Sequence, residues 1–280
     1  MKKMIGLFVA AALLAVTPLS AFAADDTLPI PKLRVDAKKR MPMISISFDV
    51  ADKDNALGAS LALLKKYDLP ATFFLTTGGV GYDGGLSWQE VQNYISLGYE
   101  VASRGHTGAD MIKTNMSSDA ISASIATSTW NIARETGAIA TVFSTAWNAG
   151  NDVSSSAARA LHLAVVSTSD YGAIVGAGQN DLAGIGDGAI SRVMLTNATD
   201  YGEICDKVAF AASDHRWLNI GIMQVVKDPK ASAPEWYDIS TANLDLVFEC
   251  ISIYANAGLI KPVTISEGLK AIAPAKVAAK

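Results

Sequence analysis

Short runs of β-forming residues alternate with segments of helical periodicity along this chain, and this alternation constrains the fold more than any other feature. Residues 43–48 and 71–75 are runs of residues typical of strands, and each is connected to the next run by a helical pattern. Repeated β-α units produce a parallel sheet covered by helices. Seven or eight such units favour closure of the sheet, so we expect a distorted (β/α)7-8 barrel. An open doubly wound sheet is the alternative, although no Gly-x-Gly-x-x-Gly follows the first strand.

The expected elements follow from periodicity and from start and stop residues. Ser87, with Glu90 three residues later, predicts a capping box at the start of a helix, and Gly137 and Gly258 are expected to end two others. A Gly- and Ala-rich stretch, residues 172–188, is expected to be a loop. The expected strands are residues 43–48, 71–75, 99–102, 140–143, 163–167, 192–195, 218–226 and 260–265. The expected helices are residues 55–67, 87–97, 118–135, 154–161, 201–212, 241–257 and a short one from residue 266.

The first 23 residues have the features of a secretory signal peptide. Lys2 and Lys3 precede an apolar run, and Ala21-Phe22-Ala23 fits the cleavage rule. A membrane anchor is the weaker alternative, because the apolar run is shorter than a span of about 20 residues. We therefore expect a periplasmic or secreted protein with no stable membrane anchor. The expected organisation is a signal peptide (1–23), a leader segment (24–41), the barrel (42–272) and a C-terminal tail (273–280).

Charge and cysteine content narrow the function classes further. The whole chain has a formal net charge of −4, and removal of two lysines with the signal peptide makes it −6. A protein with this net negative charge is a poor candidate for binding nucleic acid. Cys205 and Cys250 both lie in helical patterns, so in an oxidising compartment they could form a disulfide, or they could be two buried thiols.

In barrels of this kind the functional site lies at the carboxyl ends of the strands. Several of these ends resemble motifs of the polysaccharide deacetylase family, the chitooligosaccharide and peptidoglycan N-deacetylases. The similarity runs from about Pro42 to Leu269. The segments that carry it are FDVAD (48–52), LPATFFL (69–75), GYEVASRGHTGADM (98–111), VFSTAWNAGND (142–152), WLNIGIMQVVKD (217–228) and the final helix and strand (239–269).

The resemblance implies a hydrolase that binds a divalent metal, usually zinc, through one Asp and two His. The positions of the two histidines are occupied here by Arg104 and Gly108, and that of the metal-binding Asp by Val50 or Ala51. Only Asp49, at the position of the catalytic base, is retained. The positions of two further catalytic residues, an Arg and a His, are occupied by Ser144 and by Gln224 or Val225.

A permanent cation at Arg104 would repel a metal ion, so we favour a site without a metal cofactor. Of the three histidines, only His106 is near the expected site, and His162 and His215 are expected at the surface or in capping positions. In the alternative, zinc or another divalent metal is bound by Asp52, His106 and Asp110, together with Asp49. Asp110 could instead cap a helix.

Without a metal, Asp49 and Arg104 are expected to form an ion pair. Trp147 and Tyr171, and also Trp236, lie on predicted rim loops where aromatic rings could stack on sugars, or could simply pack in the core. The candidate ligand-binding residues are Arg104, His106, Trp147, Tyr171 and Gln224.

The resemblance implies an exported protein that binds an N-acetylated cell-envelope glycan, such as a peptidoglycan fragment. We favour a metal-free pseudoenzyme, and the alternative is an active N-deacetylase with a relocated metal site. Whether the protein is an enzyme is left open by the sequence.

Overall fold

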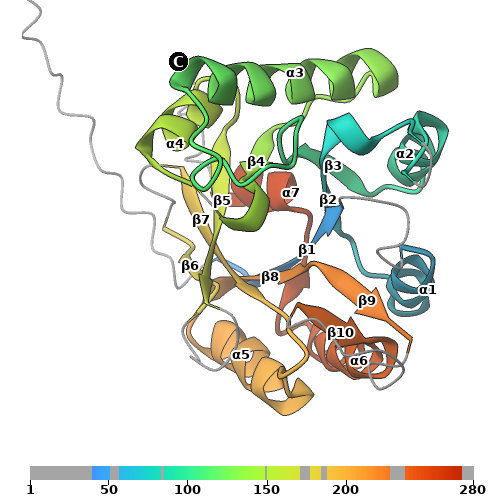
Figure 1. The fold of residues 1–280 in the computed structure, drawn as a ribbon. Coiled ribbons are helices and arrows are strands. Elements are labelled where there is room, and N and C mark those ends of the chain that lie inside the picture. The colour runs from blue at the N-terminus through green and yellow to red at the C-terminus, as the bar shows by residue number, and fades with distance from the viewer. Residues whose placement is uncertain are drawn as a thin grey trace, which may run out of the picture. The chain divides into compact units, whose positions relative to one another are not determined.

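The computed structural model describes residues 40–50, 57–82, 85–148, 150–170, 177–183, 188–227 and 237–272. Within this part of the chain, seven parallel strands form a closed barrel surrounded by helices (Figure 1). The barrel strands, in order of pairing, are β1 (Met43–Val50), β2 (Thr72–Leu75), β3 (Glu100–Ser103), β4 (Val142–Ser144), β5 (Ala164–Asp170), β7 (Ala189–Met194) and β8 (Arg216–Ile222). Strand β8 pairs with β1 from Met43 to Phe48, which closes the barrel and confirms the expected fold.

The helices lie where the periodicity predicts them, with small differences at their ends. They are α1 (Leu57–Tyr67), α2 (Trp88–Ser96), α3 (Ser118–Thr136), α4 (Asp152–Arg159), α5 (Tyr201–Ser213), α6 (Thr241–Asn256) and α7 (Ile265–Ile272). The capping box of α2 is confirmed: the backbone N–H of Glu90 donates to the Ser87 hydroxyl, and the backbone N–H of Ser87 donates to the Glu90 carboxylate. Gly137 ends α3 in the left-handed region, at φ 71°.

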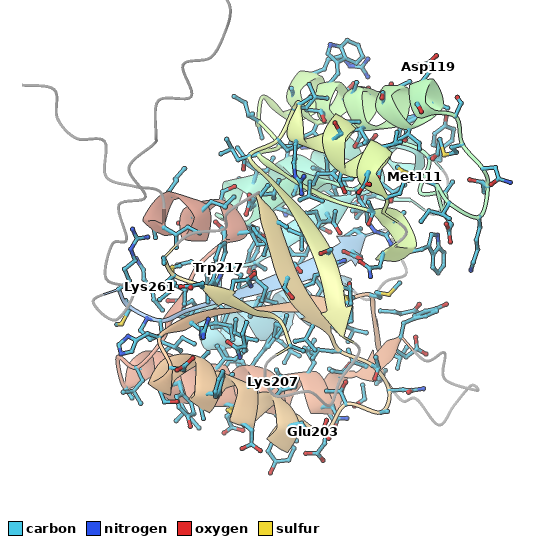
Figure 2. The ribbon with its side chains drawn as sticks, turned by 90° about the vertical axis from the view of Figure 1, so that its left-hand side faces the viewer. Met111, Asp119, Glu203, Lys207, Trp217 and Lys261 are labelled. Carbon is cyan, nitrogen blue, oxygen red and sulfur yellow. A yellow bond between two sulfur atoms is a disulfide. The ribbon has the colours of Figure 1, made fainter. Side chains whose placement is uncertain are left out.

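Helix α7 closes the amino-terminal end of the barrel. Its side chains Ile265, Leu269 and Ile272 share an apolar cluster with Trp217, which lies at the start of β8 (Figure 2). A Cβ atom on Gly268 would lie 2.3 Å from the Trp217 ring, so only glycine permits this close packing. The indole N–H of Trp217 donates to Ser45 Oγ at 3.0 Å. The opposite end, where the strands have their carboxyl ends, therefore remains available for a site.

Three of the expected elements are wrong in detail. Residues 218–226 do not form one strand, because the chain bends at Met223 and continues as β9 (Gln224–Val226). Strand β9 pairs with β10 (Asp238–Ser240) in a separate two-stranded sheet. Apolar residues typical of strands lie on both sides of Met223, so periodicity could not reveal the bend.

The stretch 172–188 is not entirely a loop, and the last expected strand is much shorter than predicted. Within 172–188, β6 (Gln179–Asp181) pairs antiparallel with β8. Residues 171–176 and 184–187 lie outside the described part of the chain. Strand β11 (Lys261–Pro262) has only two residues, which pair with Met43 and Ile44 of β1. The barrel therefore has seven strands, the lower of the two expected numbers.

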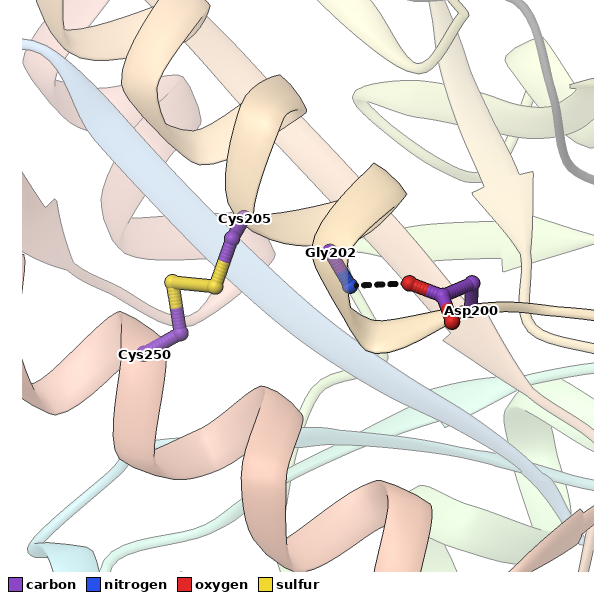
Figure 3. The surroundings of a disulfide bond; sticks show 4 residues. All are labelled: Asp200, Gly202, Cys205 and Cys250. Carbon is purple, nitrogen blue, oxygen red and sulfur yellow. Dashed lines mark hydrogen bonds between the residues drawn. A yellow bond between two sulfur atoms is a disulfide. The ribbon is translucent and has the colours of Figure 1, made fainter.

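A disulfide between Cys205 and Cys250 joins α5 to α6 (Figure 3). The two Cα atoms are 6.0 Å apart, and 45 positions separate the cysteines in the sequence. This answers the question that the sequence left open about these two residues. The bond fastens together two helices that pack side by side outside β8 and β1.

Candidate functional site

A buried carboxylate and two buried guanidinium groups meet at the carboxyl ends of the barrel strands. Asp49 is the penultimate residue of β1, Arg104 follows β3, and Arg192 lies on β7. Each of the three residues is 5% exposed or less. Burial of three charged groups in one place is expensive unless they pair with one another, so their contacts determine what this site can do.

Arg192 is the principal partner of Asp49. Its Nη1 donates to Oδ1 at 2.8 Å and its Nη2 donates to Oδ2 at 2.7 Å, a bidentate arrangement. The guanidinium also lies 5.5 Å from the centre of the Phe74 ring. Both oxygens of the carboxylate are therefore engaged by a single arginine.

Arg104 is a second, more distant partner of the same carboxylate. Its Nε lies 3.4 Å from Oδ2 of Asp49 without hydrogen-bond geometry, and its Nη1 donates a long bond of 3.4 Å to Thr76 Oγ1. The expected ion pair of Asp49 and Arg104 is thus present, but it is the weaker of the two. Within the described residues, the buried Nε of Arg104 has no hydrogen-bond acceptor.

These contacts shift the pKa of both partners. Burial alone would raise the pKa of Asp49, but the attraction of Arg192 and then Arg104, with the hydrogen bonds from Arg192, holds it below its ordinary value. Burial lowers the pKa of Arg104, the Asp49 carboxylate opposes this, and the neighbouring Arg192 adds to it. At neutral pH the carboxylate is ionised and bound in an ion pair.

Arg192 was not among the residues selected from the sequence. A signal existed, because Arg192 stands between Ile190 and Met194, at inward-facing positions of an otherwise apolar strand. An ionisable residue in such a position usually has a buried partner of opposite charge. The partner is 143 positions away in the sequence, so the pattern alone could not identify it.

The residues present do not fit a metal of the kind that the sequence resemblance implies. The guanidinium of Arg104 occupies one expected ligand position, and the other is Gly108, at φ +63°. A Cβ atom on Gly108 would lie 2.8 Å from Thr76 Cγ2, so no side chain fits there without movement. Across the described ranges, no three His, Cys, Asp or Glu residues are grouped to hold an ion.

The alternative metal ligands are only partly described. Asp52 lies outside the described residues. His106 Nδ1 forms a 3.1 Å hydrogen bond with Thr77 Oγ1. The Asp110 carboxylate accepts hydrogen bonds from the backbone N–H groups of Ile112 and Lys113, but residues 111–115 form a turn, so Asp110 holds a turn and does not cap a helix. Residues 106 and 107 form a bend and 108–110 have no regular structure, so no helical turn brings His106 and Asp110 together and the i, i+4 argument does not apply.

An aromatic side chain stands at the rim of the site. Trp147 and Asn148 both adopt left-handed backbone conformations, at φ 58° and 53°. The Asn148 amide fixes this turn, because it donates to the Thr168 carbonyl at 3.0 Å and accepts from the Thr168 N–H at 2.7 Å. The indole N–H of Trp147 donates to the Gly108 carbonyl at 3.1 Å, while 52% of the residue is exposed. A strained turn held in this way is typical of functional loops.

Trp147 and Arg104 line the same open groove. Its volume is about 560 Å³. The residues around it are Thr76, Gly78, Gly79, Arg104, His106, Thr107, Gly108 and Trp147. A smaller pocket on the other side of Trp147 contains Asp49 and Arg192. The groove is a candidate ligand site, and the ion pair lies beside it.

The remaining candidates are not brought together with this groove. Gln224 lies on β9, opposite Asp238, and is not among the residues that line the groove. Tyr171 and Trp236 lie outside the described residues. The Ser144 hydroxyl, at the position where the resemblance expects an arginine, is buried and has no hydrogen-bond partner within the described ranges.

The two other histidines have structural roles away from the groove. His162 is buried after α4, where its Nδ1 is 2.9 Å from the Ala158 carbonyl and its Nε2 is 3.1 Å from Thr129 Oγ1. It is therefore a buried capping residue, and burial lowers its pKa. The Nδ1 of His215 is 3.2 Å from the Arg40 carbonyl.

The barrel and its buried polar site define the class of the chain as a (β/α)7 barrel protein with its site at the carboxyl end of the strands. A family model described as polysaccharide deacetylase matches residues 36–166, so the resemblance inferred from the motifs is confirmed over this part of the chain. No curated protein sequence matches the chain.

Solved structures of CE4 family proteins share this fold. The Xyl-CE4 domain of a multidomain xylanase from the hindgut metagenome of Trinervitermes trinervoides has a TM-score of 0.54 and 18% identity, over 82% of this chain and 90% of that one. A mutant of a CE4 family pseudoenzyme from Bacillus anthracis, with restored enzymatic activity, also has a TM-score of 0.54. Its identity is 17%, over 82% of this chain and 68% of that one. The peptidoglycan deacetylase PdaC from Bacillus subtilis has a TM-score of 0.52 and 20% identity, over 85% of this chain and 93% of that one.

Proposed function

We propose that this chain is an exported protein of the polysaccharide deacetylase family that binds an N-acetylated cell-envelope glycan without hydrolysing it. The observation that carries the proposal is the bidentate ion pair between Asp49 and Arg192. Asp49 is the one residue that matches a catalytic position of the family, and both of its oxygens are occupied.

A general base must have a free lone pair near its target and a pKa near the working pH. The Asp49 carboxylate accepts two charge-assisted hydrogen bonds, and its pKa is held below the ordinary value. Such a group is a poor proton acceptor. A divalent metal would polarise an acetyl carbonyl and activate water, but Arg104 and Gly108 provide no ligand where the motif resemblance expects two histidines.

The groove beside the ion pair is suited to binding. The indole of Trp147 is half exposed at the rim, and aromatic rings stack well on the apolar face of a sugar ring. Its backbone turn is fixed by Asn148, so little conformational freedom is lost when a ligand binds. The similarity to a peptidoglycan deacetylase supports a glycan of the cell envelope as the ligand class.

Export is supported by the chemistry of the cysteines. A disulfide between two helices persists in oxidising compartments such as the periplasm. None of the helices in the described ranges has both the length and the apolarity needed to cross a bilayer. The proposed signal peptide, residues 1–23, lies outside the described residues.

The test uses the mature protein, beginning at residue 24. We expect no stoichiometric zinc and no acetate release from an N-acetylglucosamine tetramer, but measurable binding of a peptidoglycan fragment by calorimetry. Trp147→Ala should weaken that binding about tenfold, a loss of about 1.4 kcal/mol. Trp130→Ala is a matched control, because Trp130 is 58% exposed on α3 and does not line the groove.

The opposite result would support the active N-deacetylase with a relocated metal site. Stoichiometric zinc together with acetate release, both lost in Asp52→Ala or His106→Ala, would exclude a pseudoenzyme.

A further inference from the structure

We propose that the groove selects an acidic sugar, whose carboxylate pairs with Arg104 while its ring stacks on Trp147. This inference rests on the proposed glycan-binding function and specifies the ligand class more closely. The sugar chemistry that fits is an N-acetylated residue carrying a carboxylate, such as N-acetylmuramic acid with its lactyl group.

Arg104 is incompletely paired. Guanidinium has five N–H donors, and burial without acceptors is unfavourable. Arg104 is 4% exposed, yet its Nε has no hydrogen-bond acceptor in the described structure. Its bond to Thr76 is 3.4 Å long, at the outer limit for a hydrogen bond.

Asp49 gives Arg104 only a long contact. Its two oxygens accept bonds of 2.8 and 2.7 Å from Arg192, whereas Arg104 Nε lies 3.4 Å from Oδ2 without hydrogen-bond geometry. A second carboxylate, brought by a ligand to the part of the Arg104 guanidinium that lines the groove, would give it short charge-assisted hydrogen bonds of its own.

The described lining of the groove beside Arg104 is positively charged. Among the described residues that line it, none is acidic, and Arg104 is the permanent cation. The other polar groups are the hydroxyls of Thr76 and Thr107 and the ring of His106. The lining therefore attracts an anion and offers further hydrogen-bonding groups around it.

An aromatic platform borders the same groove. Trp147 is fixed by its bond to the Gly108 carbonyl, and Gly108 itself lines the groove. A small inorganic anion would have no use for the indole face, whereas a sugar that carries a carboxylate could contact the indole and the guanidinium together. Guanidinium matches the planar fork of a carboxylate, which favours an acidic sugar over a neutral one.

The experiment compares two forms of one disaccharide by calorimetry. The first is N-acetylglucosamine linked to N-acetylmuramic acid with a free carboxylate, and the second is its methyl ester. For the wild-type mature protein we expect the acid to bind at least about tenfold more tightly than the ester at low salt. The difference should shrink as salt is added.

Variants test whether Arg104 causes the preference for the acid over the ester. Arg104→Gln should reduce binding of the acid to the level of the ester, and Arg104→Lys should retain part of the preference because the charge remains. Arg216→Gln, an exposed arginine at the amino-terminal end of β8, is the matched control and should leave the preference unchanged. Circular dichroism of each variant confirms that it is folded.

The possible results separate the inference from the proposed function. Equal affinity for acid and ester overturns the selection of acidic sugars and leaves glycan binding intact. Binding of neither form overturns the proposed function as well. If acetate or inorganic phosphate alone binds as tightly as the acid disaccharide, the groove is a simple anion site and the sugar platform is excluded.

Discussion

The carboxylate of Asp49 is held by two short hydrogen bonds from Arg192, a residue 143 positions further along the chain. This pair joins β1 to β7 at the open end of the barrel, although the two strands are not neighbours in the sheet. The pair has a structural consequence, because it links non-adjacent strands, and a functional one, because it occupies the carboxylate that a hydrolase would use.

The first prediction concerns stability. Arg192→Met should lower the free energy of unfolding by about 3–5 kcal/mol, because it leaves a buried carboxylate with only the long contact to Arg104. Urea denaturation at neutral pH measures the change. Arg134→Met removes an exposed ion pair with Glu135 and should change stability by less than about 1 kcal/mol. A similarly small effect for Arg192→Met would show that Arg104 moves in to replace Arg192.

The second prediction concerns acid sensitivity. The pKa of Asp49 in the folded protein is below its ordinary value of 3.8, so the unfolded chain takes up a proton at higher pH than the folded one. The stabilisation is therefore complete above about pH 5 and is lost as pH falls through the folded pKa. Asp49→Asn should be less stable at neutral pH and should lose less stability between pH 5 and pH 3 than wild type.

Thermal unfolding across this pH range tests the effect. Asp245→Asn is the control for a carboxylate with a lowered pKa at the surface, where Asp245 pairs with Lys66. If wild type and Asp49→Asn showed parallel pH profiles, Asp49 would not be the carboxylate responsible.

Sequence reasoning could predict the parts of this protein that depend on local signals. The capping box of Ser87 and Glu90 and the glycine that ends α3 depend on neighbouring residues and are confirmed. The closed barrel follows from the count of β-α units. The bend at Met223 was missed, because residues typical of strands continue on both sides of it although the chain passes into a second sheet.

Only part of the site could be predicted from the sequence. The motif at residues 48–52 identified Asp49, and the position of Arg104 identified one cationic neighbour. Arg192 was missed because its role depends on a contact across the barrel with a partner 143 positions away. The pairing of Cys205 with Cys250 could not be predicted for the same reason, since helix periodicity does not place two helices side by side.

The third prediction tests whether Gly108 is required by the fold. Gly108→Ala should destabilise the protein by about 1–3 kcal/mol, because the new Cβ meets Thr76 Cγ2 at a φ of +63°. Gly98→Ala is a matched control: its φ is +88°, but no atom lies within 4 Å of the added Cβ. Gly98→Ala should lose only the stability that the backbone strain costs.

A second substitution separates the steric contribution from the backbone strain. Thr76→Ser removes the clashing methyl group and retains the hydroxyl that accepts from Arg104. It should rescue part of the loss in Gly108→Ala and none of the loss in Gly98→Ala. Equal effects in both backgrounds would show that the methyl contact does not restrict residue 108.

The fourth prediction concerns the disulfide. Reduction should lower the free energy of unfolding by up to about 4 kcal/mol, the entropy expected for a closed loop of this length. The double variant Cys205→Ser/Cys250→Ser should have the stability of the reduced wild type and should not respond to reductant. Binding to the groove should be unchanged, because neither α5 nor α6 contributes a residue to its lining. If reductant left the unfolding midpoint of wild type unchanged, the bond would not stabilise the folded barrel, and the support that it gives to export would be lost.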